Sequence, residues 1–363
     1  MSNSDDIDLL KRLCSTPTAP FAEHRVIDFV ERWARRRRRL SVRADRFGNR
    51  LIECPGSRRQ PRLVMVAHGD HPGLLAGTTD TDGTLHADFH GGVMPEYLSG
   101  AEMQFFASRK PVAARVLKVE QDERGRASKV TLRAADAVPP GTLGMFALGE
   151  ARLRGKRMHC RVCDDLAGVS AALAVLDRLA RKPSAAPVAL LLTRAEEQGF
   201  IGAIASVEHP ALLRKTDLLV SLECSAEQPY AKQGQGVIIR VGDRTSVFDS
   251  SLTAFIVERA AAIASEHGSF RFQRALMPGG TCEATVFDAW GYTASAMCVA
   301  LGNYHNMDRA NRRLAAEHIH LDDWAGMVTL LENVAREAHR FEPGMKSLRR
   351  TLVGRFERYR SLL

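Results

Sequence analysis

Two pairs of adjacent carboxylates, Asp164-Asp165 and Glu196-Glu197, lie beside segments with regular secondary-structure patterns. The first pair precedes an apolar helical pattern, and the second pair follows a run that is typical of a buried strand. Carboxylate oxygens are hard ligands that bind divalent cations. We therefore expect residues 161–200 to form the floor of a metal site, with further ligands supplied from elsewhere in the chain.

Three more residues with metal-binding side chains, His68, Glu223 and His305, lie at or just beyond the ends of predicted strands. Ligands in α/β proteins collect at the carboxyl ends of parallel strands, so these side chains are expected to meet the acidic pairs. Two histidines with three carboxylates favour two divalent ions, Zn²⁺ or Co²⁺ ahead of Mn²⁺, because the set is neither all-oxygen nor thiolate. One carboxylate must then bridge the two ions.

The chemistry expected of such a site is hydrolysis. Two neighbouring cations lower the pKa of a shared water to about 7, so a bridging hydroxide exists at neutral pH. Glu196 lies beside a ligand and can act as the general base. Asp70 lies two residues after His68, on the same side of an extended chain, where it can accept the second ring N–H of that histidine. If one ion holds the free α-amino group of a peptide, the enzyme acts from the N-terminus.

The pattern of strands and helices that must position these residues indicates the α/β class. Buried-strand patterns alternate with helical patterns, which favours a doubly wound, mostly parallel sheet with helices on both faces. The strand patterns cover residues 63–67, 188–192, 217–222 and 293–299. From residue 73 to residue 159 the helical periodicity is absent, and short strands alternate with turn signals. We expect a small all-β domain at 73–159, inserted into a catalytic domain formed by 1–72 and 160–363.

Composition places the chain among globular proteins. It has 363 residues, 45% of them apolar, and a formal charge of +9. Basic runs at Arg35–Arg39 and from Lys346 to Arg360 are typical of solvated helix faces, with an acidic partner or nucleic acid as the alternative. No aromatic residues are regularly interleaved with them, which does not favour a nucleic-acid partner. Seven cysteines without a framework indicate free thiols, and no segment reaches the roughly 20 apolar residues of a membrane span. We expect a cytoplasmic protein with no membrane partner.

The order of these motifs resembles the TET-like, tetrahedral aminopeptidases with two co-catalytic metals, the glutamyl and deblocking aminopeptidase group. The resemblance covers almost the whole chain and is carried by His68-Gly69-Asp70, Asp164-Asp165-Leu166-Ala167-Gly168, Glu196-Glu197-Gln198-Gly199, Glu223, His305 and, in the insertion, Gly91-Gly92-Val93-Met94-Pro95. It implies an aminopeptidase with an apical domain that mediates self-association into a homo-oligomer, often a dodecamer.

The resemblance also implies roles for the ligands. One ion would be held by His68, Asp164 and Glu223, and the other by Asp164, Glu197 and His305. Asp164 would bridge, with a cis peptide bond after it, and Glu196 would be the general base.

Several positions depart from the family pattern. Glu223 replaces a more common Asp, Leu166 replaces an Arg, and Cys282-Glu283 replaces Asp-Ala. These changes leave the metal ligands intact and concern the substrate pocket. An amidase or deacylase of small N-acyl substrates on the same dimetal site is an alternative to a peptidase. A catalytically silent metal-binding relative is a second alternative, although the non-ligating Glu196 argues against it. Cys160 and Cys163 form a lone C-x-x-C pair, which is weak evidence for a structural zinc site.

Overall fold

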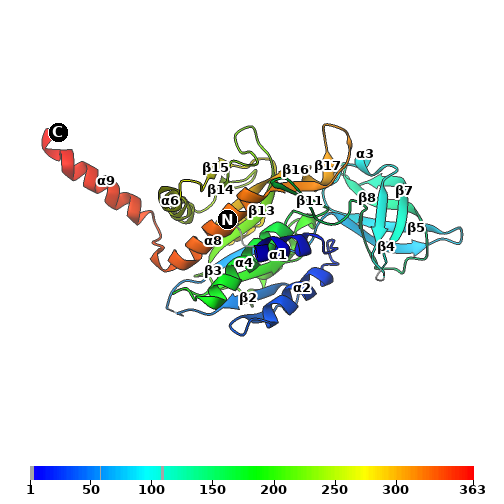
Figure 1. Ribbon diagram of the computed structural model, residues 1–363, viewed down its shortest axis with the longest axis horizontal. Coiled ribbons are helices and arrows are strands. Elements are labelled where there is room, and N and C mark those ends of the chain that lie inside the picture. The colour runs from blue at the N-terminus through cyan, green and yellow to red at the C-terminus, as the bar shows by residue number, and fades with distance from the viewer. Residues whose placement is uncertain (1–3, 58, 108–109) are drawn as a thin grey trace.

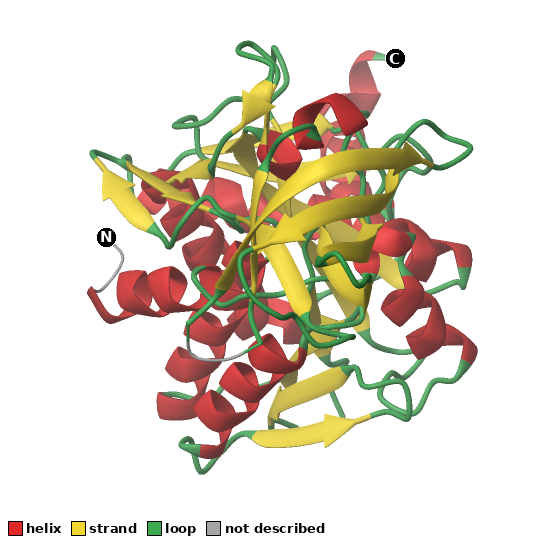
Figure 2. Cartoon of the chain, turned by 90° about the vertical axis from the view of Figure 1, so that its right-hand side faces the viewer, coloured by secondary structure: helices red, strands yellow, loops and turns green. Residues whose placement is uncertain are grey.

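The computed structural model describes residues 4–57, 59–107 and 110–363, which form two parts (Figure 1). Within these residues, an 11-stranded sheet with its helices makes the larger part and a closed six-stranded barrel makes the smaller one. The barrel lies at the right-hand end in Figure 1 and faces the viewer in Figure 2. The predicted α/β fold with an inserted β unit is confirmed.

Four parallel strands form the centre of the large sheet. Across the sheet their order is β12 (Val188–Thr193), β3 (Leu63–His68), β13 (Leu218–Ala226) and β16 (Thr293–Gly302). Their side chains are almost all buried, which agrees with the continuous apolar runs in the sequence. Parallel pairing places the carboxyl ends of all four strands at one edge.

Antiparallel strands extend this centre on both sides. On one side β12 pairs with β2 (Arg50–Cys54), which forms a hairpin with β1 (Ser41–Ala44). On the other side, β16 pairs with both β14 and β19. The remaining bounds are β14 (Val237–Gly242), β15 (Phe272–Leu276), β19 (Glu317–His320), β11 (Arg157–Cys160) and β10 (Arg152–Arg154). The strands β19, β11 and β10 were not predicted, because strands of three or four residues show no clear period.

Helices cover both faces of the sheet. One face packs against α1 (Ser4–Cys14), α2 (His24–Arg35), α4 (Leu166–Arg181), α6 (Ser250–Glu266) and α8 (Leu321–Glu337). The other face packs against α5 (Ile201–Glu208) and α7 (Glu283–Ala289). Side chains alternate along each strand, so Met65 joins the first core and Val64 joins the second. None of the described helices is both long and apolar enough to cross a membrane.

The barrel closes around a core of its own, in the strand order β4-β5-β8-β7-β6-β9. Its strands are β4 (Gly73–Thr79), β5 (Thr84–His90), β6 (Glu102–Phe105), β7 (Val112–Gln121), β8 (Ala127–Ala134) and β9 (Leu143–Phe146), with the short helix α3 (Pro95–Leu98) after β5. β10 and β11, which also fall within the predicted unit 73–159, pair in the large sheet instead.

Two small elements complete the chain. β17 (Met307–Asp308) and β18 (Arg313–Leu314) form a hairpin directly after His305. The helix α9 (Lys346–Tyr359) projects from the large part at the end opposite the barrel (Figure 1).

Candidate metal centre

The predicted ligands converge at the carboxyl edge of the central strands. His68 is the last residue of β3, Glu196 and Glu197 lie in a short turn after β12, and His305 follows β16. Glu223 lies inside β13, which continues for three more residues, rather than at its end. Because these four strands are parallel neighbours, segments that are distant in sequence meet here.

The described residues hold three groups of candidate ligand atoms, each within a 4.8 Å span. Two of them contain the predicted ligands: His68, Glu196 and Glu223, and Asp164, Glu197 and His305. The third consists of Asp164, Asp165 and Cys224. Nε2 of His68 also lies 3.7 Å from Oδ1 of Asp164, so Asp164 borders both groups. Glu196 belongs to the first group and lies 4.0 Å from His68 Nε2 through its Oε2. All six side chains surround one small volume.

Several buried atoms in these groups have no hydrogen-bond partner among the described residues. They include Nε2 of His305, Oε1 of Glu197 and Oε1 of Glu223. Nε2 of His305 lies 3.1 Å from Oε1 of Glu197, although no hydrogen bond joins them. Buried polar atoms are normally paired, and lone pairs that face each other satisfy this need by binding a cation. The donor set of carboxylate oxygens and imidazole nitrogens therefore fits divalent metal ions.

Asp70 holds the acidic pair in place. Its two oxygens accept the backbone N–H groups of Glu196 and Glu197, each at 3.0 Å. Its Oδ1 lies 3.5 Å from Nδ1 of His68, too long for a good hydrogen bond. The predicted bond from the His68 ring to Asp70 is therefore not made, because the turn after β12 supplies two backbone donors that the sequence pattern did not reveal.

Asp164 and Asp165 have different roles in the structure. The peptide bond between them is cis, as the resemblance implied. Oδ1 of Asp164 accepts the backbone N–H of Cys224 at 3.3 Å and faces the two ligand groups. Asp165 instead caps α4 by accepting the N–H of Gly168 at 3.2 Å.

Glu317, on β19, is a fully buried residue that the sequence reasoning missed. Its Oε2 accepts the backbone N–H groups of Cys163 at 2.7 Å and of Asp164 at 3.1 Å. Its Oε1 accepts the N–H of His305 at 2.9 Å. One carboxylate thus ties together two ligand-bearing segments. The alternation of Glu317-His318-Ile319-His320, which is typical of a strand with one buried face, was the available signal.

His71 also holds the Asp164 segment in place. Its Nδ1 lies 2.8 Å from the carbonyl oxygen of Asp164, and its Nε2 lies 3.0 Å from Oδ1 of Asn306. Asn306 in turn donates to the carbonyl oxygen of Arg161 at 3.0 Å. Both sides of the Asp164 segment are therefore held by buried hydrogen bonds.

Crowding of acidic groups in this buried place changes their proton affinity. Burial, together with the carboxylate of Asp164, raises the pKa of Glu223 to about 8. Burial also raises the pKa of Glu196 well above its usual value, and Glu223 adds to this effect. For His68, burial lowers the pKa, but nearby carboxylates led by Glu196 outweigh it and raise the pKa. A cation at this point would favour the ionised carboxylates and the neutral imidazole.

A cavity of about 330 Å³ opens onto both groups. Asp164, Glu196, Glu197 and Glu223 line one side of it. The lining also includes Arg240, Met277, Gly279, Gly280, Thr281, Tyr304 and Arg309. Arg240 is buried and donates to Oγ of Ser225 at 3.1 Å. The cavity is the natural place for a substrate next to the ligands.

Cys160 and Cys163 lie behind Asp164 in the main core, with their sulfur atoms 3.2 Å apart. All seven cysteines are free and buried. The His318 ring lies beside the His159 ring in a tilted arrangement with centroids 4.9 Å apart, and His320 caps α8.

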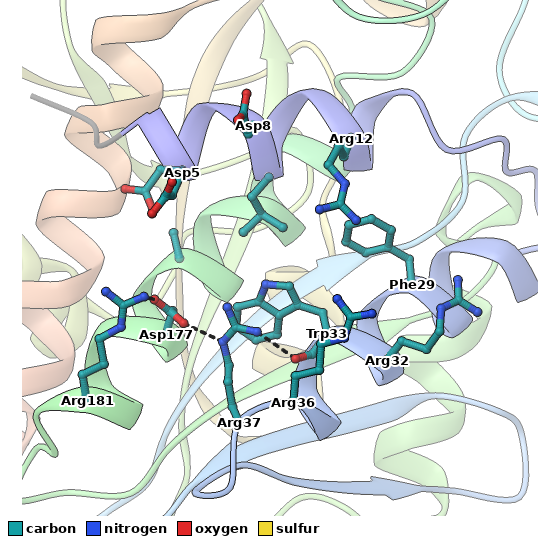
Figure 3. A pocket seen from close by; sticks show the side chains of 13 residues that line it. Asp5, Asp8, Arg12, Phe29, Arg32, Trp33, Arg36, Arg37, Asp177 and Arg181 are labelled. Atoms are coloured by element: carbon teal, nitrogen blue, oxygen red, sulfur yellow. Dashed lines mark hydrogen bonds and ion pairs between the residues drawn. The ribbon is translucent and has the colours of Figure 1, made fainter.

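A second cavity, of about 470 Å³, lies between α1, α2 and α4 (Figure 3). Arg12, Arg32, Arg36, Arg37 and Arg181 line it together with Asp5, Asp6, Asp8 and Asp177. Arg37 binds Asp177 at 2.5 Å and packs over the Trp33 ring, so part of the basic run at Arg35–Arg39 serves ion pairing at the surface. No predicted ligand lines this cavity.

Comparison with solved structures shows the same fold over nearly the whole chain. The TET1 peptidase of Pyrococcus horikoshii is 22% identical, with a TM-score of 0.75 over 92% of this chain and 99% of that one. A TET aminopeptidase from Thaumarchaeota archaeon SCGC AB-539-E09 is 16% identical, with a TM-score of 0.77 over 94% and 100%.

Two sequence comparisons bear on the family, and the longer match decides it. A lysyl aminopeptidase of Pyrococcus furiosus is 30% identical over 109 residues, which are 29% of this chain and 30% of that protein, so the match spans less than a third of that relative. The model of the family described as M42 glutamyl aminopeptidase matches residues 48–321. This span covers most of the chain and all the predicted ligands, so the chain belongs to the M42 glutamyl aminopeptidase family.

Proposed function

We propose that this chain is a dimetal aminopeptidase that removes residues from the N-termini of peptides. The observation that carries the proposal is the convergence of two ligand groups whose lone pairs face each other without hydrogen bonds, above all His305 Nε2 and Glu197 Oε1 at 3.1 Å. His68 and Glu223 would hold one ion, Glu197 and His305 the other, and Asp164 would bridge. Zn²⁺ or Co²⁺ suits this mixed nitrogen and oxygen set better than Mn²⁺.

When bound, such a pair of ions lowers the pKa of a water molecule and polarises a carbonyl group. Glu196 would take a proton from the attacking water on its carboxylate and pass it to the leaving amine. Burial raises the pKa of Glu196 in the metal-free protein, and bound cations would lower it again, so that the carboxylate could accept the proton. Asp70 would position Glu196 and Glu197 by fixing their backbone N–H groups.

The cavity supports action at the end of a peptide. Its volume of about 330 Å³ lies at the lower end of the range for ligand sites, enough for a terminal residue. The carboxylates around it attract an α-amino group. We also propose that the chain forms a homo-oligomer, since the Pyrococcus horikoshii relative assembles into a tetrahedron or an octahedral shell. Seven free cysteines support a reducing, cytoplasmic setting.

A substrate screen tests the proposal. Protein reconstituted with Zn²⁺, Co²⁺ or Mn²⁺ is assayed on chromogenic aminoacyl substrates and on their N-acylated counterparts. The proposal expects turnover only of substrates with a free α-amino group. Preference for the N-acylated set would assign a deacylase, and no turnover with any ion would support the silent alternative. Light scattering on the same sample measures the size of the assembly.

A further inference from the structure

The helix α9 presents an apolar stripe that no part of the described chain covers. Leu348, Leu352, Phe356 and Tyr359 form this α9 stripe, with a spacing of three or four residues that places them on one helix face. Their exposed fractions are 45%, 50%, 54% and 53%. A surface helix normally turns such a face to the core, so this stripe requires another apolar environment.

Basic side chains border the α9 stripe on both sides. The helical period places Arg355 along one border and Arg349 and Arg360 along the other. Residues 342–363 hold six basic and two acidic side chains, a net charge of +4 out of +9 for the chain. Both acidic groups are already in ion pairs, Glu342 with Arg350 at 2.7 Å and Glu357 with Arg360 at 3.0 Å.

The position of α9 leaves the stripe accessible. Figure 1 shows the helix projecting from the large part, away from the barrel. Its start is fixed, because the backbone N–H groups of Gly344 and Met345 donate to Oγ of Ser251 at 3.0 and 3.3 Å. These bonds tie the start of the helix to α6, and the rest of α9 extends away from the large part (Figure 1).

The charges around the α9 stripe indicate which kind of partner covers it. Two α9 helices paired through their stripes would bring arginines against arginines, which is unfavourable at the borders of a helix pair. The remaining chain also carries a positive net charge, so the body of a second copy offers no general attraction. A bilayer with anionic headgroups accepts both features, since apolar side chains enter the acyl boundary and guanidinium groups bind the phosphates.

We propose that α9 binds the surface of membranes that contain anionic lipids, with its axis in the plane of the interface. Binding of this kind needs no spanning segment. It therefore revises the expectation of no membrane partner, which was drawn from the absence of such a segment. The proposal does not depend on the peptidase activity, because none of these residues lies near the metal centre.

Vesicle flotation of the full-length protein tests the proposal. The probes are vesicles of phosphatidylcholine alone and of equal parts phosphatidylcholine and phosphatidylglycerol. We expect binding to the anionic vesicles at least about tenfold tighter than to the neutral ones, and weaker binding as salt rises. No binding to the anionic vesicles, or equal binding to both kinds, would overturn the proposal.

Two matched variants test whether vesicle binding depends on the α9 stripe or on exposed apolar side chains in general. Leu352→Glu with Phe356→Glu should lower anionic-vesicle binding at least about tenfold and leave peptidase turnover unchanged. The matched control is Leu117→Glu with Val247→Glu, which adds the same charge at exposed apolar positions on the barrel and on a loop, and should bind like the wild type. If the α9 variant keeps its vesicle binding, the stripe is not a lipid contact. The same holds if the wild type binds no vesicles and the α9 variant loses oligomer mass in light scattering.

Discussion

Nδ1 of His305 lies 3.1 Å from the carbonyl oxygen of Gly92, and this contact joins the metal centre to the barrel end of the molecule. A carbonyl oxygen only accepts, so Nδ1 donates and Nε2 keeps its lone pair toward Glu197. The β insertion thus fixes the tautomer of a proposed ligand.

Asp164 borders both ligand groups, so its removal should affect both ions. We expect Asp164→Ala to bind neither ion tightly, whereas Glu223→Ala should affect mainly one. Metal titration followed by calorimetry measures the two affinities separately. Loss of a single ion from Asp164→Ala would show that this carboxylate does not bridge.

Glu196→Gln tests the general base. The amide cannot take a proton from water, so kcat should fall roughly 10²–10⁴-fold. The metal content should remain close to that of the wild type, because the five proposed ligands are intact. The control is Glu258→Gln on the exposed face of α6, which should have normal kinetics. Unchanged turnover in Glu196→Gln would reassign the base.

Glu317→Gln tests the buried carboxylate that links Asp164 to His305. Its amide N–H₂ group would face at least one backbone N–H group, so the ligand segments should loosen and metal affinity should fall roughly 10–100-fold. Asp323→Asn is the matched control, since Asp323 is buried and accepts N–H groups of Gly234 and Gly236 at 2.7 and 2.8 Å, away from the ligands. Equal metal loss in both variants would indicate a general packing effect.

Asp217→Ala tests the stability of the large sheet. Arg62 is buried completely, and its Nη2 lies 2.6 Å from Oδ2 of Asp217. Removal of the aspartate leaves a buried positive charge with less compensation, so the free energy of unfolding should fall by roughly 3–5 kcal/mol. The exposed pair Asp28–Arg32, at 3.9 Å, provides the control, and Asp28→Ala should cost less than about 1 kcal/mol. Urea unfolding measures both, and equal small losses would contradict the estimate.

Much of this architecture could be predicted because its causes are local. The buried run of β3 and the helical pattern of α4 both reflect periodic burial, which sequence records directly. The convergence of His68, Glu196 and His305 followed from strand ends in a parallel sheet. Glu317 could not be found in this way, because its partners are backbone N–H groups 12 to 154 residues away that no side-chain pattern encodes. The true partners of Asp70 were missed for the same reason.

Elemental analysis of purified, metal-reconstituted protein tests the central claim most directly. If His68, Asp164, Glu197, Glu223 and His305 hold two cations, the protein should retain about two divalent ions per chain after extensive dialysis. A variant with both His68→Ala and His305→Ala sets the background. A reproducible value near zero in the wild type, equal to that background, would contradict the account.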